Sequence, residues 1–247
     1  MRVVYFSPHL DDAIFSCGGI IAHQAQMGEN VEIWSFFTAD PPSEKLTAFA
    51  KILHKRWRQQ GSPYELRRLE DEEACRILGV KSRHFNFPDC IYRYYDSDES
   101  PLVKKTSDLF KPVREPEDGL EVSVLSRVFL ELLSDDLIVL PLGVGGHIDH
   151  ILIRHLGKTL KNVKLFYPDF PYSGKLDSIE DLQLPMDAYE TRFVLESQEI
   201  ELWKKAAGSY HSQISSFWKS PEVLYKAIDK YASSRIGCAL WTLPETA

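Results

Sequence analysis

Near its N-terminus the chain reads VVYFSPHLDDA over residues 3–13, an apolar β-rich run followed at once by a polar turn. Residues 13–27 then place apolar side chains at helical spacing, and residues 31–37 form a second apolar run. A strand, a helix and a second strand in this order form a βαβ unit, whose strands are parallel. The stretch therefore predicts a parallel sheet, with the polar turn at the carboxyl end of its first strand.

The rest of the chain continues this alternation. We expect helices at 46–60, 65–78, 122–133, 149–160, 198–210 and 221–231, and strands at 83–87, 137–142, 163–167 and 191–196. This order predicts the α/β class, with a Rossmann-like, doubly wound, mostly parallel sheet and helices on both faces. Residues 92–119 are rich in Pro, Asp and Ser without a period, which predicts an irregular surface insertion in a single domain over 1–247.

Composition and charge narrow the class of protein. Of the 247 residues, 44% are hydrophobic, which is ample for a buried core. The formal net charge of −7 supplies no basic surface for a phosphate backbone, so we expect no nucleic-acid partner. Apolar runs are far shorter than the roughly 20 residues of a membrane helix, and no signal-peptide pattern is present, so we expect no membrane insertion.

The four cysteines, Cys17, Cys75, Cys90 and Cys238, are scattered and form no C-x-x-C pair. A chain of this length has no need of disulfides, and the spacing does not suit a shared zinc ion. We therefore expect buried, reduced thiols in a cytoplasmic protein, and the sequence leaves open whether it forms a homo-oligomer.

Two clusters of polar side chains follow predicted strands. His9, Asp11 and Asp12 come after the first strand, and Gly145-Gly146-His147-Ile148-Asp149-His150 comes after residues 137–142. In open α/β sheets, ligands bind at the carboxyl ends of the strands, so the clusters are expected to meet across one crevice. Together they offer two imidazoles and a carboxylate for a metal, with a spare Asp and a spare His. The alternative for the acid pair alone is a helix N-cap with a solvated neighbour.

These motifs resemble those of a known family. Pro8-His9-Leu10-Asp11-Asp12 with His147-Ile148-Asp149-His150 is similar to the signature motifs of the PIG-L/LmbE-like zinc N-deacetylases, which remove acetyl groups from N-acetylglucosaminyl conjugates. The resemblance extends to residues 67–70, to Phe87-Pro88-Asp89 and to Ser212-Gln213, and leaves out 92–119 and the last thirty residues.

The sequence departs from the common form of the first motif at two positions. The family often has Pro and Glu where this chain has Leu10 and Ala13. This form resembles a branch that includes deacetylases of antibiotic and other natural-product glycans. The departures alter no expected metal or catalytic position, but they leave the substrate open beyond a small-molecule glycoconjugate.

The resemblance implies a role for each motif residue. His9, Asp12 and His150 would bind Zn²⁺, or another divalent metal such as Fe²⁺. Asp11 would be the general base that activates water and returns the proton to the departing amine. His147, best protonated, would stabilise the oxyanion, and Asp149 would hold the His147 imidazole in orientation.

Two further residues are expected to contact the sugar. Arg67 resembles a family arginine that hydrogen-bonds sugar hydroxyls, and its alternative is an i,i+3 pair with Glu70 on an exposed helix face. Asp89 is the second candidate, and its alternative is an ordinary turn acid after Pro88.

Two other functions use similar features. A 2-His-1-carboxylate iron oxygenase would use the same three ligands, but oxygen chemistry has no need of the unligated Asp11 and His147. A non-catalytic, metal-containing sugar-binding protein on this fold is the other alternative, and the intact set of catalytic positions argues against it. Metal analysis and a test for 2-oxoglutarate turnover distinguish the oxygenase from a hydrolase.

Overall fold

A seven-stranded sheet forms the centre of the computed structural model, which describes residues 1–44, 46–57 and 62–244. The strand order is β3-β2-β1-β4-β5-β7-β6. The first five strands in this order are parallel, and β7 runs antiparallel to both β5 and β6. The strands are β1 (Arg2–Ser7), β2 (Asn30–Ser35), β3 (Lys81–His84), β4 (Leu137–Pro141), β5 (Lys164–Tyr167), β6 (Tyr189–Arg192) and β7 (Ala239–Thr242).

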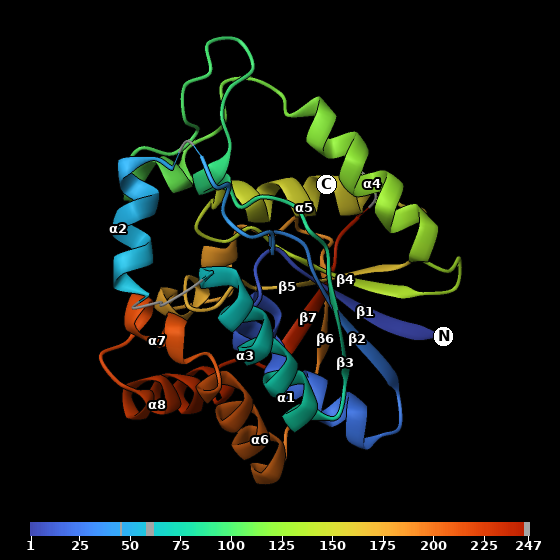
Figure 1. Ribbon diagram of the computed structural model, residues 1–247. Coiled ribbons are helices and arrows are strands. Elements are labelled where there is room, and N and C mark those ends of the chain that lie inside the picture. Colours follow the sequence, from blue (N-terminus) through green and yellow to red (C-terminus); the bar gives the residue numbers. More distant parts are fainter. Residues whose placement is uncertain (45, 58–61, 245–247) are drawn as a thin grey trace.

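Helices cover both faces of the sheet (Figure 1). One face carries α1 (Asp12–Gln26), α3 (Pro63–Leu78), α6 (Ser197–Gly208) and α8 (Pro221–Ala232), and the other carries α4 (Asp118–Glu131) and α5 (Ile148–Thr159). The shorter α2 (Ala48–Arg56) and α7 (His211–Phe217) lie beyond the carboxyl ends of the parallel strands. The predicted α/β class with a mostly parallel, doubly covered sheet is therefore confirmed.

The first strand is central because its apolar run is long enough to be buried on both sides. β1 pairs with β2 on one edge and with β4 on the other, and Val3 to Phe6 are all buried. The chain continues from β1 to β2 and β3 in one direction, and from β4 to β5 in the other. The order of the strands thus reverses between β1 and β4, which is where ligands bind in such sheets.

Helix α1 packs closely against α6 because glycine removes a side chain from the contact. Trp203 of α6 is fully buried over Gly18, and its indole N–H donates to the carbonyl oxygen of Ile14 at 2.7 Å. A Cβ atom on Gly18 would lie 2.1 Å from Cδ1 of the Trp203 ring. The two helices can therefore pack this closely only because residue 18 is glycine.

We expect Gly18→Ala to lower the free energy of unfolding by about 1–3 kcal/mol, because the methyl group must displace a fully packed indole. Urea denaturation measures the change. The matched control is Gly119→Ala, since a Cβ there meets nothing within 4 Å. Equal stability of the two variants would contradict the close contact between α1 and α6.

Several element boundaries differ from the sequence-based expectation. The strand predicted at 191–196 is β6 at Tyr189–Arg192, because Glu196 instead forms a capping box with Glu199 at the start of α6. The strand predicted at 83–87 is β3 at Lys81–His84. Neither β7 nor the separate α7 was expected, and residues 58–60 of the helix predicted at 46–60 lie outside the described residues.

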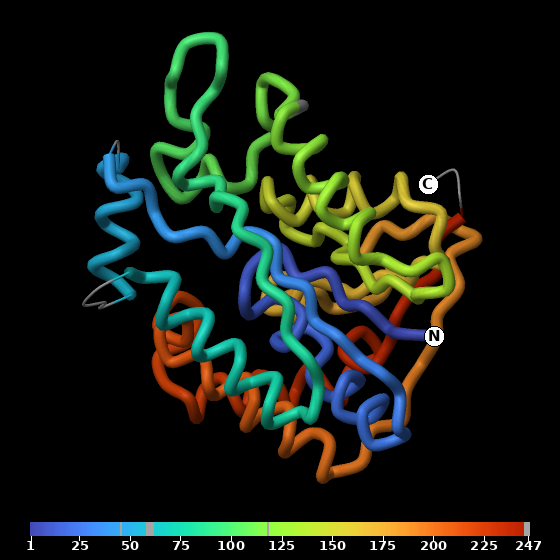
Figure 2. Tube along the Cα trace, turned by 45° about the vertical axis from the view of Figure 1, so that its right-hand side comes forward, coloured from blue at the N-terminus to red at the C-terminus, as the bar shows by residue number. Residues whose placement is uncertain are grey.

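The segment 92–119 projects from the sheet and helices (Figure 2), and it is more than a surface loop. It contains a 3-10 helix at Thr106–Phe110, and Leu102 and Val103 are buried. These side chains join a second apolar cluster with residues of α2 and with Tyr64. The segment therefore forms one wall beside the carboxyl ends of the strands.

All four cysteines are buried free thiols, in agreement with the expectation. Among the described residues, no helix has both the length and the apolar character needed to span a bilayer.

Candidate active site

The polar turn after β1 is held by its own residues. Ser7 Oγ donates to the carbonyl oxygen of His9 at 2.5 Å and accepts the backbone N–H of Ala13 at 3.0 Å. The backbone N–H of His9 donates to Asp12 Oδ2 at 2.7 Å. Asp11 is the N-cap of α1 by backbone conformation, but its side chain makes no capping hydrogen bond. The turn thus fixes the Asp12 carboxylate, whereas none of these hydrogen bonds holds that of Asp11.

Asp12 connects the two polar clusters. Its Oδ2 lies 3.1 Å from His9 Nδ1 and 3.3 Å from His150 Nε2. Against the effect of burial, the two imidazoles hold the pKa of Asp12 well below its usual range. Despite burial, Asp12 and Asp169 raise the pKa of His150 to about 10. One carboxylate oxygen of Asp12 is therefore close to an imidazole nitrogen of each of the other two residues expected to bind metal.

The second turn, after β4, depends on left-handed glycine. Gly145 has φ 87°, and a Cβ there would lie 2.9 Å from the ring of Tyr172. This turn delivers His147 to the N-cap of α5, where its Nδ1 accepts the backbone N–H of Asp149 at 3.3 Å. His150 follows in the first turn of the helix, so both imidazoles reach the cleft from one helix end.

The surroundings of His147 favour the neutral imidazole, whereas the resemblance implies a protonated one. Burial, reinforced by nearby His9 and His150, lowers the pKa of His147 to about 3. Because Nδ1 accepts a hydrogen bond, the neutral ring carries its proton on Nε2. His147 can thus donate one hydrogen bond without being a cation.

Asp149 does not hold His147, which corrects the role expected for its carboxylate. Its Oδ2 lies 3.0 Å from His9 Nε2 and accepts the backbone N–H of Cys90 at 3.2 Å. Its Oδ1 pairs with the buried guanidinium of Arg93 at 2.5 Å. Against burial, Arg93 and His9 hold the pKa of Asp149 far below its usual range. Asp149 therefore fixes the orientation of His9 as a permanent anion.

Sequence reasoning missed Asp169, which orients the other imidazole. His150 Nδ1 lies 2.6 Å from Asp169 Oδ1, and Asp169 Oδ2 accepts the backbone N–H of Val144 at 2.8 Å. Asp169 is buried and follows β5, the strand next to β4. An acid two residues beyond a predicted strand was the available signal, and its position at the same edge of the sheet would have identified it.

Asp11 lies beside Asp12 but in a different electrostatic environment. Burial and the charge of Asp12 raise the pKa of Asp11 to about 6, while Arg67 opposes this rise. Arg67 Nη2 is 3.7 Å from Asp11 Oδ1. One acid of the adjacent pair is therefore firmly ionised and the other titrates near neutrality, which is the division of labour that a metal ligand and a proton carrier need.

Arg67 is buried, so it is not one half of an exposed pair with Glu70. Its guanidinium lies over the rings of Trp57 and Tyr64, at 5.2 and 4.9 Å from their centroids. The Nε atom of Arg67 has no hydrogen-bond partner among the described residues. Glu70 instead accepts both the backbone N–H and the hydroxyl of Ser212, at 2.8 and 2.6 Å.

Asp89 reaches the same cleft from the segment after β3. Its Oδ2 accepts the Tyr64 hydroxyl at 2.5 Å and lies 3.7 Å from His9 Nε2, while Oδ1 accepts the backbone N–H of Ile91. The turn-acid alternative is thus partly right, since the Asp89 side chain caps a short 3-10 helix. The Oδ2 atom of Asp89 nevertheless lies on the side of His9.

Of the site residues expected from the sequence, all except Asp149 line one cavity of about 280 Å³. Its wall also includes Gln213, whose amide N–H₂ donates to Ser212 Oγ at 2.9 Å. Two hydrogen bonds in series, from Gln213 to Ser212 and from Ser212 to Glu70, therefore hold the Gln213 amide at the edge of the cavity. Tyr172 and Phe217 complete the apolar part of this wall.

Among the described residues, the sets of three donor atoms that all lie within 4.8 Å of one another do not include His9, Asp12 and His150 together, and one of them is Cys90, His147 and Asp149. Donor atoms of His9, His147 and His150 lie within 4.8 Å of one another, as do those of His9, Asp89 and Asp149. Asp149 is already neutralised by Arg93, and Asp89 already accepts from Tyr64. Asp12 is the best placed of the three acids to bind a metal. Its Oδ2 is surrounded only by two imidazoles and one backbone N–H.

Comparison with known proteins identifies the family. The model of the PIG-L family, described as GlcNAc-PI de-N-acetylase, matches residues 4–161. The chain therefore belongs to the PIG-L family, which confirms the resemblance of its motifs.

Two curated relatives are both 2′-N-acetylparomamine deacetylases. The protein from Streptomyces fradiae is 30% identical over 189 residues, 72% of this chain and 60% of its own length. The protein from Niallia circulans is 30% identical over 190 residues, 68% of this chain and 66% of its own length. The chain thus spans about three fifths to two thirds of these relatives.

Solved structures share the fold. The zinc-inhibited form of teicoplanin deacetylase Orf2 gives a TM-score of 0.79 at 24% identity, over 98% of this chain and 97% of that chain. N,N′-diacetylchitobiose deacetylase from Pyrococcus horikoshii gives a TM-score of 0.58 at 17% identity, over 99% of this chain and 84% of that chain.

Proposed function

We propose that this protein is a metal-dependent N-deacetylase that hydrolyses the N-acetyl group of an amino-sugar conjugate to a free amine and acetate. The observation that carries the proposal is the single Asp12 oxygen between His9 Nδ1 and His150 Nε2, with the separate Asp11 carboxylate beside it. The curated relatives support the reaction, since both are deacetylases of an N-acetylated amino sugar.

Two of the three donor–donor distances in this set are close to those around a divalent metal, for which Zn²⁺ is our proposal. Ligand atoms about 2.0–2.2 Å from a tetrahedral ion lie about 3.3–3.6 Å apart, and Asp12 Oδ2 is 3.1 and 3.3 Å from the two imidazole nitrogens. The other imidazole nitrogens are held by Asp149 and Asp169, as is usual for metal-bound histidine. When bound, such a metal polarises a carbonyl group and makes water more acidic.

The protein's own groups supply the proton transfers. Asp11 accepts a proton from the attacking water at a carboxylate oxygen and later delivers it to the amine nitrogen as the C–N bond breaks. His147 donates its Nε2–H to the carbonyl oxygen as negative charge develops there. A neutral donor with a pKa of about 3 does this throughout the neutral range without titrating.

The sugar is held by polar side chains of the cavity wall. Arg67 offers its guanidinium and Asp89 a carboxylate oxygen at the cavity wall. Gln213 donates one amide N–H to Ser212 and has its carbonyl oxygen as an acceptor for a hydroxyl. The planar guanidinium suits adjacent hydroxyl oxygens, which points to a sugar ring as the bound group.

The reaction is tested by incubating the zinc-loaded protein with a panel of N-acetylglucosamine conjugates and measuring free amine and acetate. We expect release of both in equal amounts from at least one conjugate. Oxidisable iron in protein purified in air, with 2-oxoglutarate consumption and no amine release, would favour the oxygenase instead. Sugar binding at full metal occupancy without amine release would favour a non-catalytic protein.

We expect Asp169→Asn to weaken metal binding by about 10–100-fold, because the carboxylate that orients His150 becomes a neutral amide. Competition with a chelator of known affinity measures the change. The control is Asp136→Asn, which removes a similarly buried carboxylate that pairs with Arg2 at the other end of the sheet. Equal metal affinity in both variants and the wild type would show that Asp169 does not support the metal site.

A further inference from the structure

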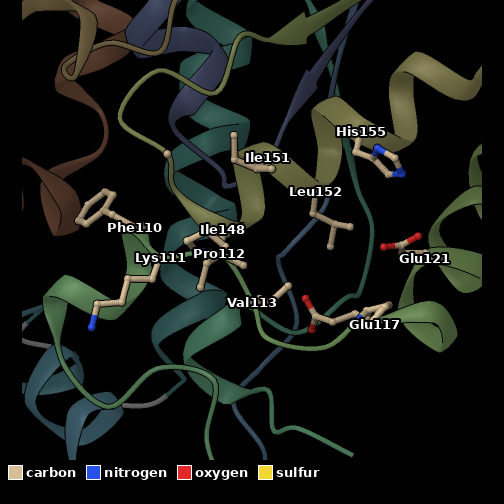
Figure 3. A pocket seen from close by; sticks show the side chains of 12 residues that line it. Phe110, Lys111, Pro112, Val113, Glu117, Glu121, Ile148, Ile151, Leu152 and His155 are labelled. Atoms are coloured by element: carbon tan, nitrogen blue, oxygen red, sulfur yellow. The ribbon is translucent and has the colours of Figure 1, made fainter.

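A second, apolar cavity of about 420 Å³ lies next to the catalytic cleft. Figure 3 shows Ile148, Ile151 and Leu152 of α5 on one side, and Pro112 and Val113 of the segment 92–119 on the other. Its volume is in the range of small-molecule sites, roughly 300–1,000 Å³. The mechanism proposed above makes no use of it.

The two cavities meet at Phe110 and at the turn before α5. Phe110 lines both, and its ring centroid is 5.8 Å from that of His147. Gly146 and Ile148 line the apolar cavity, while His147 between them lines the catalytic cleft. The Phe110 ring is therefore a shared wall of the two cavities, past which a group attached to a substrate in the cleft would reach the apolar cavity.

The charges around the apolar cavity restrict what it accepts. The carboxylates of Glu117 and Glu121 and the imidazole of His155 line the end away from Phe110, and the amino group of Lys111 points away from the space (Figure 3). Glu117 is paired with Arg93 at 3.1 Å. A phosphate or carboxylate head group would meet acidic oxygens there, so the lining suits an uncharged apolar group.

We propose that this cavity binds an apolar aglycone carried by the amino-sugar conjugate, and so selects substrates in which the sugar bears such a group. The assignment rests on the proposed function. If the acyl group is acetyl, the acyl side of the substrate has only one methyl group to bury. The larger apolar cavity must then serve the other part of the conjugate. Burial of each methylene group is expected to tighten binding by about fourfold.

The test is calorimetric binding of methyl, butyl and octyl N-acetyl-β-glucosaminides, below their micelle concentrations, to the wild type and to two variants. Val113→Asp places a charge in the apolar wall, and Val113→Thr changes polarity at nearly constant shape. The control is Val194→Asp, at an apolar residue with 81% exposure that does not line the cavity. Circular dichroism and metal content confirm that each variant is folded.

We expect affinity to rise by about fourfold per methylene in the wild type and in Val194→Asp, and this rise to be reduced in both Val113 variants while methyl-glycoside binding stays unchanged. Equal affinity for all three glycosides, or an undiminished rise in the Val113 variants, would overturn the proposal. Preference for N-octanoylglucosamine over the octyl glycoside would assign the cavity to the acyl group instead, and also overturns it. Chain-length dependence without amine release would refute the deacetylase activity alone.

Discussion

Asp11→Asn is expected to lower turnover by about 10²–10⁴-fold while leaving the metal content at one per chain, because it removes only the proton carrier. The change keeps the shape of the side chain, and Asp11 makes no capping hydrogen bond that would be lost. Metal analysis and steady-state rates on the same preparation measure the two effects. The matched variant is Asp12→Asn, which we expect to lose the metal itself.

The opposite result, with metal lost in Asp11→Asn and kept in Asp12→Asn, would exchange the roles of the two acids. The pH dependence gives a second check. A general base must be ionised, so the rate is expected to fall as the pH drops through the pKa of Asp11. Burial places that pKa at about 6, and a bound cation would lower it, so the acid limb should lie at or below pH 6.

His150→Ala is expected to abolish both metal binding and activity. It removes one of the three donors around Asp12 Oδ2 and leaves the buried Asp169 without its imidazole partner. Because a buried carboxylate without its partner is costly, we also expect a loss of stability of about 3–5 kcal/mol. Elemental analysis after dialysis and thermal denaturation measure the two effects.

The matched control is His155→Ala, which removes an exposed imidazole from the same helix. We expect His155→Ala to keep both its metal and its stability. Metal content in His150→Ala equal to that of the wild type would exclude His150 as a ligand and require a different set, such as His9 with His147.

Much of the architecture could be predicted because it depends on local patterns. The apolar run 3–6, the helical spacing after it and the run 31–37 define a βαβ unit whatever the rest of the chain does. The polar residues at two strand ends likewise predict a shared site, because parallel strands place their carboxyl ends at one edge of the sheet. The family model then confirmed the membership that these motifs had indicated.

Strand β7 and the short helix α7 were missed because the signals that define them are tertiary. Trp241 of β7 is buried through pairing with β5 and β6, which no local period reveals. The segment 92–119 has no period either, yet Val103 within it is fully buried against α2 and Tyr64. Burial here depends on which distant elements meet.

The sequence by itself determined the parallel part of the sheet, the two motifs and most of the residues that meet between β1 and β4. Only the tertiary structure decided which side chain each of them contacts. Asp149 faces His9 and Arg93 instead of His147, and Asp169 arrives from β5 to hold His150. The physical reason is that charge and hydrogen bonding depend on distances across strands, and buried neighbours that lower the pKa of His147 to about 3 come from parts of the chain far apart in sequence.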